Sequence, residues 1–197
     1  MKIALIILSG IALVALIYIL FAARYDTFSN KTFARQLAKE AMSKIGLDEQ
    51  GWKTALVASE TVVNATPEVV WQYWSQIERW PEWSTELHQS AKFTSDTQWE
   101  EGSTFEQALD LGMAGKVTGN ETVKFVEPAS KIMWWKEENG MKSCHIWVFE
   151  RLDADKTKII NVEVFDGTII GIMKPILIPD WQKKFDAGLI NLEKKFQ

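Results

Sequence analysis

Between residues 90 and 165 the chain consists almost entirely of short alternating segments separated by turn-forming residues. Strand-like segments are expected at roughly 90–94, 103–110, 116–126, 131–136, 142–151 and 157–165. The breaks between them carry Gly, Pro, Asn and Asp, the residues that favour turns. Asn139-Gly140 is the strongest hairpin signal, because both residues tolerate positive φ. Strands that follow one another through tight turns predict an antiparallel meander.

Elements of other types flank this run of strands. A strand is expected from Leu56 to Asn64, and Thr66-Pro67-Glu68 then opens a helix with a Thr cap and Pro in the first turn. That helix is expected to stop at Pro81, and a second short helix to follow over 83–87. A long amphipathic helix is expected at 180–196. Because one sheet face needs an apolar partner, this order predicts an α+β fold with a curved antiparallel sheet wrapped around the C-terminal helix.

The first residues form a separate apolar segment. From Ile3 to Ala23 the sequence carries no charge, and about 20 such residues suffice to cross a bilayer as a helix. A cleaved signal peptide is the alternative, but its apolar region is usually only roughly 7–15 residues long. We therefore predict a single-pass transmembrane helix in which residues 3–23 contact the membrane. Basic residues gather just after it, at Arg24, Lys31, Arg35 and Lys39, which favours a cytoplasmic C-terminal domain.

Three regions are expected along the chain. Residues 1–24 form the anchor, 25–51 a juxtamembrane amphipathic helix and linker, and 52–197 the folded domain. Within the second region a helix is expected from Asn30 to Ile45, closed by Gly46. This helix either lies at the membrane surface or packs on the domain.

Composition excludes several classes of function. The net charge of −4 and the absence of a basic run argue against a nucleic-acid partner. Two histidines and one cysteine provide no cluster of metal ligands, so we expect neither a metal nor another cofactor. Cys144 and His145 are neighbours on a strand, so they point to opposite faces and cannot form a nucleophile–base pair. Ten tryptophans are unusual, and such side chains either fill a core or line a cavity.

Several segments together resemble a known family. The sequence VVNATPEVVWQYWSQIERWPEWS, from Val62 to Ser84, resembles the opening of the polyketide cyclase/dehydrase-like branch of the START-like, or SRPBCC, superfamily. Further matches are EEGSTF at 100–105, VKFVEPASKIMW at 123–134 and EVFDG at 163–167. The resemblance extends from about Leu56 to the C-terminus. It implies a helix-grip fold, in which the sheet and the long helix enclose an apolar cavity that binds a lipid, a polyketide or another small hydrophobic molecule.

One polar pair stands out within the expected sheet. If the turn at 153–155 pairs Phe149 with Ile159, His145 lies opposite Glu163 on the same sheet face. A slip of one residue would send Glu163 to the other face, and a solvent-exposed cross-strand pair is the alternative. Within a cavity the two side chains could orient a polar group of a ligand. We expect these residues to bind the ligand: Trp83, Phe105, Trp134, His145, Trp147, Glu163, Phe165 and Phe185.

The sequence leaves three functions open. A membrane-tethered domain that binds a hydrophobic ligand, with no catalytic residues, is the main prediction. The alternatives are a cyclase- or dehydratase-type enzyme that uses His145 and Glu163 as acid and base, and a protein-interaction module. The apolar stretch 169–179 carries two prolines, which should interrupt a helix. It is expected to be either a mobile cavity mouth that faces the bilayer or a kinked, buried start of the last helix.

Overall fold

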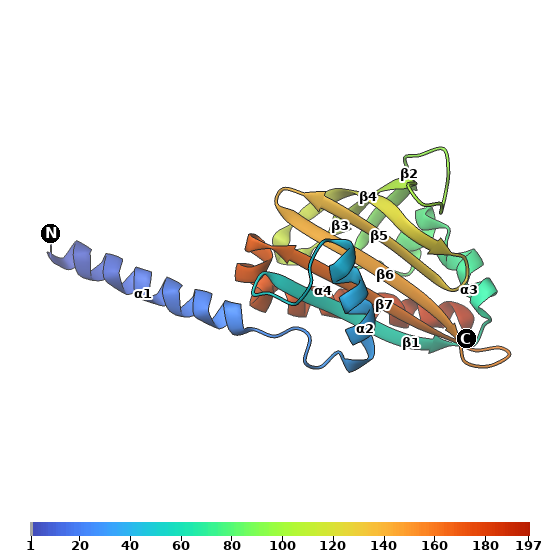
Figure 1. Cartoon of the computed structure of the whole chain (residues 1–197), viewed down its shortest axis with the longest axis horizontal. Coiled ribbons are helices and arrows are strands. Elements are labelled where there is room, and N and C mark those ends of the chain that lie inside the picture. Colours follow the sequence, from blue (N-terminus) through green and yellow to red (C-terminus); the bar gives the residue numbers. More distant parts are fainter. Residues whose placement is uncertain (1) are drawn as a thin grey trace.

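Seven antiparallel strands form one curved sheet in the computed structural model, which describes the backbone of residues 2–197 and the side chains of residue 7 and residues 10–197 (Figure 1). The strand order is β1-β7-β6-β5-β4-β3-β2, so every neighbour from β7 to β2 is joined through one connection, and the meander is confirmed. The strands are β1 (Thr54–Val63), β2 (His88–Phe93), β3 (Thr104–Asp110), β4 (Lys116–Glu127), β5 (Lys131–Glu138), β6 (Met141–Arg151) and β7 (Thr157–Gly167).

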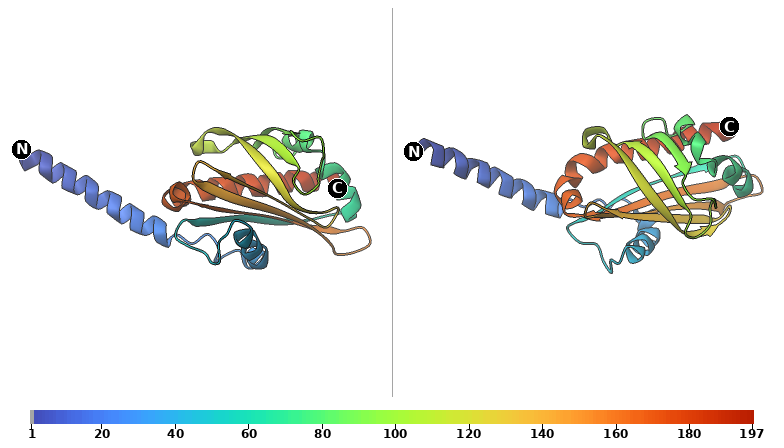
Figure 2. Two further views of the ribbon diagram at one scale, coloured as in Figure 1. Left: turned by 45° about the horizontal axis from the view of Figure 1, so that its top comes forward. Right: turned by 90° about the horizontal axis from the view of Figure 1, so that it is seen from above.

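The long helix α4 (Thr168–Glu193), followed by the turn η4 (Lys194–Phe196), lies in the concave face of the sheet (Figure 2). The helix-grip prediction is therefore confirmed for this part of the chain. The helix begins at Thr168 and runs through Pro175 and Pro179, so the prediction of a break there was wrong. Leu177 and Ile178 are buried against β1, and this packing outweighs the cost of proline within a helix.

The helix also covers the open edge of β1. The Gln182 side chain accepts a hydrogen bond from the Ala58 N–H at 3.2 Å and donates one to the Ala58 carbonyl oxygen at 2.9 Å. An unpaired edge strand is a site for association with other chains. Gln182 therefore satisfies part of that edge with a side chain from the same molecule.

Two short helical segments follow β1, as expected. Helix α3 (Pro67–Trp74) begins at the Thr66 cap, whose hydroxyl oxygen accepts a hydrogen bond from the Val69 N–H. The second segment is the 3-10 helix η2 (Ile77–Glu82), which contains Pro81. It lies earlier in the chain than the predicted helix at 83–87, where the structure has only a turn.

The amphipathic helix of the second region packs on the domain. The short turn η1 (Thr32–Ala34) leads into α2 (Arg35–Lys44), whose buried face includes Ala38, Ala41 and Met42. These side chains contact the outer, convex face of the sheet, where Cys144 and Ile146 of β6 are fully buried. The helix therefore packs on the domain, which is the second of the two interpretations left open by the sequence. Gly46 follows the helix with φ 77°, as expected for its C-terminal residue.

Helix α1 (Lys2–Arg24) projects away from the body of the domain (Figures 1 and 2). Tyr18 near its end donates a hydrogen bond to the Ile172 carbonyl oxygen of α4 at 3.0 Å. Among the residues described, no helix is long and apolar enough to cross a membrane, so the predicted transmembrane span is not supported. Part of that span, the side chains of residues 3–6, 8 and 9, lies outside the described residues.

The space between the sheet and α4 is packed differently at its two ends. At the end near α3, a cluster of aromatic side chains fills the interior, with Trp74, Trp80, Trp83, Trp134 and Trp147 all buried. Their rings pack in stacked, tilted and edge-to-face arrangements at centroid distances between 5.2 and 6.1 Å. At the end near α1, a second cluster from β1, β7 and α4 leaves space between its side chains.

Candidate ligand-binding site

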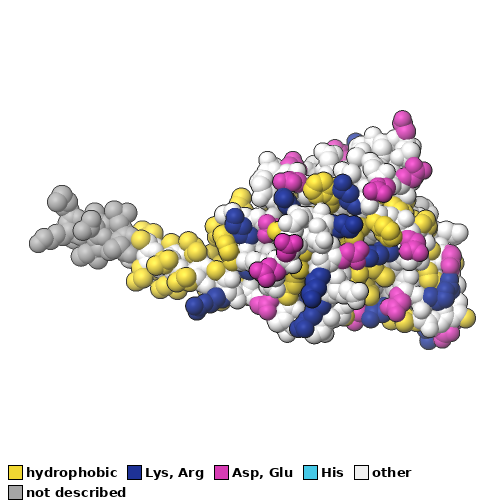
Figure 3. Space-filling model, in the orientation of Figure 1, with side chains coloured by type: hydrophobic (Ala, Val, Ile, Leu, Met, Phe, Trp, Pro, Cys, Tyr) yellow, Lys and Arg dark blue, Asp and Glu magenta, His cyan; other side chains and the backbone are white. Residues whose placement is uncertain are grey.

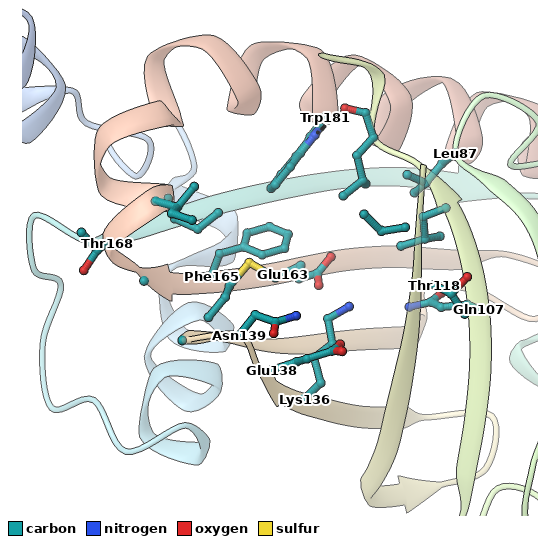
Figure 4. Close-up of a pocket in the computed structure, with 18 of the residues that line it drawn as sticks. Leu87, Gln107, Thr118, Lys136, Glu138, Asn139, Glu163, Phe165, Thr168 and Trp181 are labelled. Carbon is teal, nitrogen blue, oxygen red and sulfur yellow. Dashed lines mark hydrogen bonds between the residues drawn. The ribbon is translucent and has the colours of Figure 1, made fainter. Parts of the chain in front are cut away.

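A cavity of about 560 Å³ lies between α4 and the concave face of the sheet, at the end from which α1 leaves (Figure 4). Its walls come from the ends of β3, β5 and β7, the starts of β4, β6 and α4, and the middle of α4. The apolar lining residues are Leu87, Leu109, Leu111, Val117, Met141, Phe165, Ile169, Ile170, Trp181 and Phe185. A volume of several hundred Å³ with a mostly apolar lining is typical of a site for a small molecule.

Two chain reversals and the start of α4 frame the mouth of the cavity. The turn between β5 and β6 is formed by Asn139 and Gly140, both with positive φ, which confirms the hairpin expected from the sequence. The connection between β3 and β4 contributes Leu111 to the lining. Ile169 in the first turn of α4 lines the cavity and is also largely exposed. The mouth therefore includes an apolar side chain, Ile169, that faces solvent.

The stretch 169–179 combines features of both interpretations left open by the sequence. Ile169 and Ile170 line the cavity, as expected for a mouth. The rest of the stretch is helical, and Leu177 and Ile178 are buried, as expected for the start of the terminal helix.

One wall of the cavity is polar. Lys136, Glu163 and Gln107 line it alongside the apolar residues, and Figure 4 shows the Lys136 and Glu163 side chains pointing toward each other. The Lys136 ammonium lies 3.2 Å from Glu121 Oε1, and the Glu121 side chain is only 2% exposed. Gln107 Nε2 donates to the same Glu121 oxygen at 3.0 Å. The ion pair is thus buried and held by a further hydrogen bond.

Glu163 lies directly opposite His145, as the predicted register required. The His145 side chain is 8% exposed and the Glu163 side chain is 15% exposed, so the alternative of a solvent-exposed pair is wrong. His145 Nδ1 lies 3.4 Å from Glu163 Oε2. His145 Nε2 donates to the Asn161 Oδ1 atom, which leaves Nδ1 as an acceptor. Burial lowers the pKa of His145 to about 3 and raises the pKa of Glu163 to about 8. At neutral pH both groups are therefore uncharged, and the Glu163 carboxyl can donate to His145 Nδ1.

The second histidine belongs to a neighbouring polar chain. His88 Nδ1 lies 2.7 Å from Ser84 Oγ, and its Nε2 lies 3.2 Å from Gln107 Oε1. Burial lowers the pKa of His88 to about 4, so it too is neutral near pH 7. Together with Gln107 and Glu121, it connects the polar cavity wall to the aromatic core.

The eight residues predicted to bind ligand divide into three groups. Glu163, Phe165 and Phe185 line the cavity. Trp83, His145 and Trp147 border a separate void of about 10 Å³, large enough for about one water molecule, which Phe185 also borders. The remaining two, Phe105 and Trp134, are buried in the aromatic cluster. Ligand contact by these eight side chains stays a prediction.

The sequence reading missed Lys136 and Gln107, although a signal for both was present. Side chains two residues apart on a strand share a face. Lys136 follows Trp134 by two positions on β5, and Gln107 follows Phe105 by two positions on β3. Because Trp134 and Phe105 were expected to point inward, the same alternation places Lys136 and Gln107 on the inward face.

Within the part of the chain that is described, no group of three or more His, Cys, Asp or Glu side chains could hold a metal ion. What the wall offers instead is hydrogen bonding in a low-dielectric cavity. Lys136 supplies a charged donor, the Glu163 carboxyl a neutral donor and acceptor, and Gln107 an amide. Such groups can bind a polar substituent of an otherwise apolar molecule, or transfer a proton to it.

Comparison with solved structures gives the same architecture. The chain resembles TTHA0849 from Thermus thermophilus, with a TM-score of 0.59, 17% identity and coverage of 72% of this chain and 96% of that one. A START superfamily protein from Mycobacterium smegmatis matches with a TM-score of 0.57, 14% identity, and coverage of 72% and 96%. The Zhui aromatase/cyclase from Streptomyces sp. R1128 matches with a TM-score of 0.57, 14% identity, and coverage of 73% and 96%. At these identities the likeness establishes the fold and leaves the function open.

Sequence comparison identifies the family. No curated protein sequence matches the chain. Residues 54–197, which include all seven strands and α4, match the family described as polyketide cyclase / dehydrase and lipid transport. The chain therefore belongs to the polyketide cyclase/dehydrase and lipid transport family.

Proposed function

We propose that this protein binds a small hydrophobic molecule in the cavity between α4 and the sheet, and that α1 attaches the domain to a membrane. The observation that carries the first part is the cavity of about 560 Å³ with its mostly apolar lining. Tryptophan packs the opposite end of the interior densely, yet the end near α1 retains this space. An unfilled apolar cavity is costly to maintain, which supports a role in holding a ligand.

Membrane attachment is supported by the surface of α1. Its described side chains include apolar residues that are largely exposed, and Figure 3 shows many yellow side chains along the part of the helix that is not grey. These residues are Ile7, Ile11, Leu13, Val14, Leu16, Ile17, Ile19, Leu20 and Phe21. An exposed apolar surface of this length needs a partner, and a bilayer is the partner that we propose. We place the domain on the cytoplasmic side because basic residues follow α1.

Two measurements test the attachment. Full-length protein should sediment with membranes and resist extraction by alkaline carbonate, whereas protein lacking residues 1–24 should be released. Protease added to the outside of intact cells should not digest the domain. A full-length protein found in the carbonate-soluble fraction would contradict the attachment, and external digestion would contradict the orientation.

Ligand binding is tested by recovering the molecule that accompanies the protein. Full-length protein is purified in mild detergent, extracted with organic solvent, and the extract is analysed by mass spectrometry. Leu109 lines the cavity, so L109W should fill part of it and reduce the amount of ligand recovered. The matched control is L152W at the opposite end of the domain, where Leu152 is half exposed.

The expected result is a hydrophobic compound in near-stoichiometric amount in the wild type and in L152W, and a clear loss in L109W. Equal recovery from all three proteins would show that the compound binds outside the cavity. If no compound is recovered and the purified protein takes up no hydrophobic probe, the proposed function is refuted.

A second candidate function is acid–base catalysis on the bound molecule. Glu163 lines the cavity in its protonated form, because burial raises its pKa to about 8. His145 does not line the cavity and reaches the ligand only through Glu163, so Glu163 would donate the proton and His145 would orient it. Conversion of the recovered compound during incubation, abolished in E163Q but not in E150Q, would favour the enzyme. Recovery of the unchanged compound would favour the carrier.

A further inference from the structure

We propose that the ligand carries an oxygen acceptor, a carboxylate or carbonyl group, and that Lys136 binds this oxygen at the inner wall of the cavity. The inference rests on the proposed function and assigns the chemical class of the ligand. Lys136 is the one basic side chain among the residues that line the cavity, and it is only 11% exposed. A cation is costly to bury, so its presence within an apolar cavity indicates a specific role.

The ion pair is arranged with its cation toward the cavity. Lys136 lines the cavity, whereas Glu121 does not and lies behind it at 3.2 Å. Gln107 Nε2 donates to Glu121 at 3.0 Å and so holds the carboxylate in place. The pair therefore presents a positive end to any molecule in the cavity, although its total charge is zero.

The ammonium of Lys136 also has unused donors. An ammonium group carries three N–H donors, and Glu121 is its one hydrogen-bonding or ionic partner among the described residues. Gly119 on the neighbouring strand β4 makes room for it, because a Cβ atom there would lie 2.5 Å from Lys136 Nζ. The absence of a side chain at this position keeps the ammonium in the cavity wall.

The neighbouring groups favour an acceptor over a cation. Thr118 also lines the cavity and offers an uncharged O–H donor, and Glu163, whose pKa lies near 8, is uncharged at neutral pH and adds no negative charge to the wall. Glu138 is the remaining acid of the lining, and it is exposed at the mouth. A ligand oxygen at the inner wall therefore meets N–H and O–H donors, whereas a ligand ammonium there would meet the like charge of Lys136.

The apolar remainder of the ligand has a defined direction. From Lys136 the lining continues over Phe165, Met141 and Ile170 to the exposed Ile169 at the mouth. A molecule with its oxygen at Lys136 thus extends its apolar part toward the end from which α1 leaves (Figures 1 and 4). The polar group is bound inside and the hydrocarbon points outward.

The test compares amphiphiles that differ only in their polar end. Full-length protein in phosphatidylcholine nanodiscs is titrated with 12-bromododecanoate, the methyl ketone of matching length with a terminal bromine, and 12-bromododecylamine. Bromine quenches tryptophan fluorescence on contact, and Trp181 lines the cavity. W181F identifies the part of the signal that comes from the cavity. Partitioning into the nanodisc is the same for every variant, so the ratio of affinities between variants reports binding to the protein.

Lys136→Met removes the charge but leaves the buried Glu121 carboxylate without its partner, which could prevent folding. The double variant E121Q/K136M removes both charges and retains an acceptor for Gln107. We expect it to bind the carboxylate or the ketone at least tenfold more weakly than wild type, and the amine no more weakly. E121Q alone retains Lys136 and should still bind the oxygen-bearing chain.

The outcomes separate this inference from the proposed function. Weaker binding of the carboxylate alone identifies an anionic ligand, and weaker binding of the ketone as well identifies a carbonyl acceptor; both support the proposal. If all three chains bind to the wild type and the double variant binds each one equally well, Lys136 does not select the ligand and the inference is overturned, while the cavity remains a binding site. If none of the three binds, both proposals fail.

Discussion

Replacing Glu163 with Gln tests whether the cavity wall holds a protonated carboxyl group at neutral pH. Burial raises the pKa of Glu163 from its ordinary value of 4.5 to about 8. Between these two values the folded protein binds more protons than the unfolded chain. Its free energy of unfolding therefore falls as the pH rises through this range, by at most about 1.4 kcal/mol per pH unit for one proton.

The two histidines act in the opposite direction and at lower pH. Burial lowers the pKa of His145 to about 3 and that of His88 to about 4, from an ordinary value of 6.5. Their contribution to stability is lost as the pH falls through 6.5 toward their folded pKa values. At pH 6.5 each histidine is still half protonated in the unfolded chain, so the two together add about 0.8 kcal/mol between pH 6.5 and pH 8. From pH 6.5 to pH 8 the histidine contribution is common to wild type and E163Q, so the difference between their changes in stability reports on Glu163.

Over that window the ionisation of Glu163 alone should lower the unfolding free energy by about 1.6 kcal/mol, because its slope falls to half the maximum at pH 8. The two histidines offset about 0.8 kcal/mol of this, so the wild-type protein should lose about 1 kcal/mol in all. E163Q should instead gain about 0.8 kcal/mol from the two histidines, because glutamine does not titrate. Glutamine also has nearly the same shape and can donate its amide N–H to His145 Nδ1. E163Q should consequently be the more stable protein at pH 8.

Both changes in unfolding free energy are measured by urea unfolding at pH 6.5 and pH 8. Full-length protein is used in mild detergent, and unfolding is followed by tryptophan fluorescence. E150Q is the matched control, since Glu150 is exposed near the opposite end of β6. It should follow the wild type. If E163Q loses as much stability as the wild type over this window, Glu163 is already ionised at neutral pH and the reasoning about the cavity wall is refuted.

Three further substitutions or reactions probe the packing around the site. G171A should lower the unfolding free energy, measured by urea unfolding, by about 1–3 kcal/mol, because a Cβ atom there would lie 2.7 Å from the Trp52 ring. G51A is the control and should change the stability little, since its Cβ atom would meet nothing closer than 3.7 Å. W74A should cost about 3–5 kcal/mol, measured in the same way, since Trp74 is fully buried among aromatic rings; a loss below about 1 kcal/mol would show that the cluster closes around the gap. Burial raises the pKa of Cys144 to about 12, so a thiol reagent at pH 8 should modify it only after unfolding; rapid modification of the native protein would contradict its burial beneath α2.

Most of the architecture was predictable because its signals are local. Strand alternation, the Asn139-Gly140 turn and the Thr66-Pro67 helix start depend on neighbours in the sequence, and each appears in the structure. The start of α4 was mistaken because the proline rules consider only the helix itself. The apolar face before residue 180 packs against β1, and that contact is absent from any local pattern.

The candidate site was less predictable, for a different reason. The residues that lie opposite each other on neighbouring strands can be predicted from the strand register, and the predicted pairing of His145 with Glu163 was correct. Whether an inward side chain meets a cavity or a packed core depends on the volumes of all the side chains around it. Trp134 and Glu163 both point inward, yet one is enclosed by aromatic rings and the other lines open space.

The two ends of the interior explain how a cavity can persist in a domain this small. Rings from α3, η2 and four strands interlock at the end away from α1, and this packing supplies apolar burial without help from the other end. Outside the sheet, α2 buries the convex face of β6 and β7 and adds a second packed layer. Strands that are held on one side by the aromatic cluster and on the other by α2 need no side chains to fill the space beneath α4. The aromatic cluster and α2 therefore supply much of the stability of the fold away from the cavity, so apolar substitutions in the cavity lining can change what the domain binds without unfolding it.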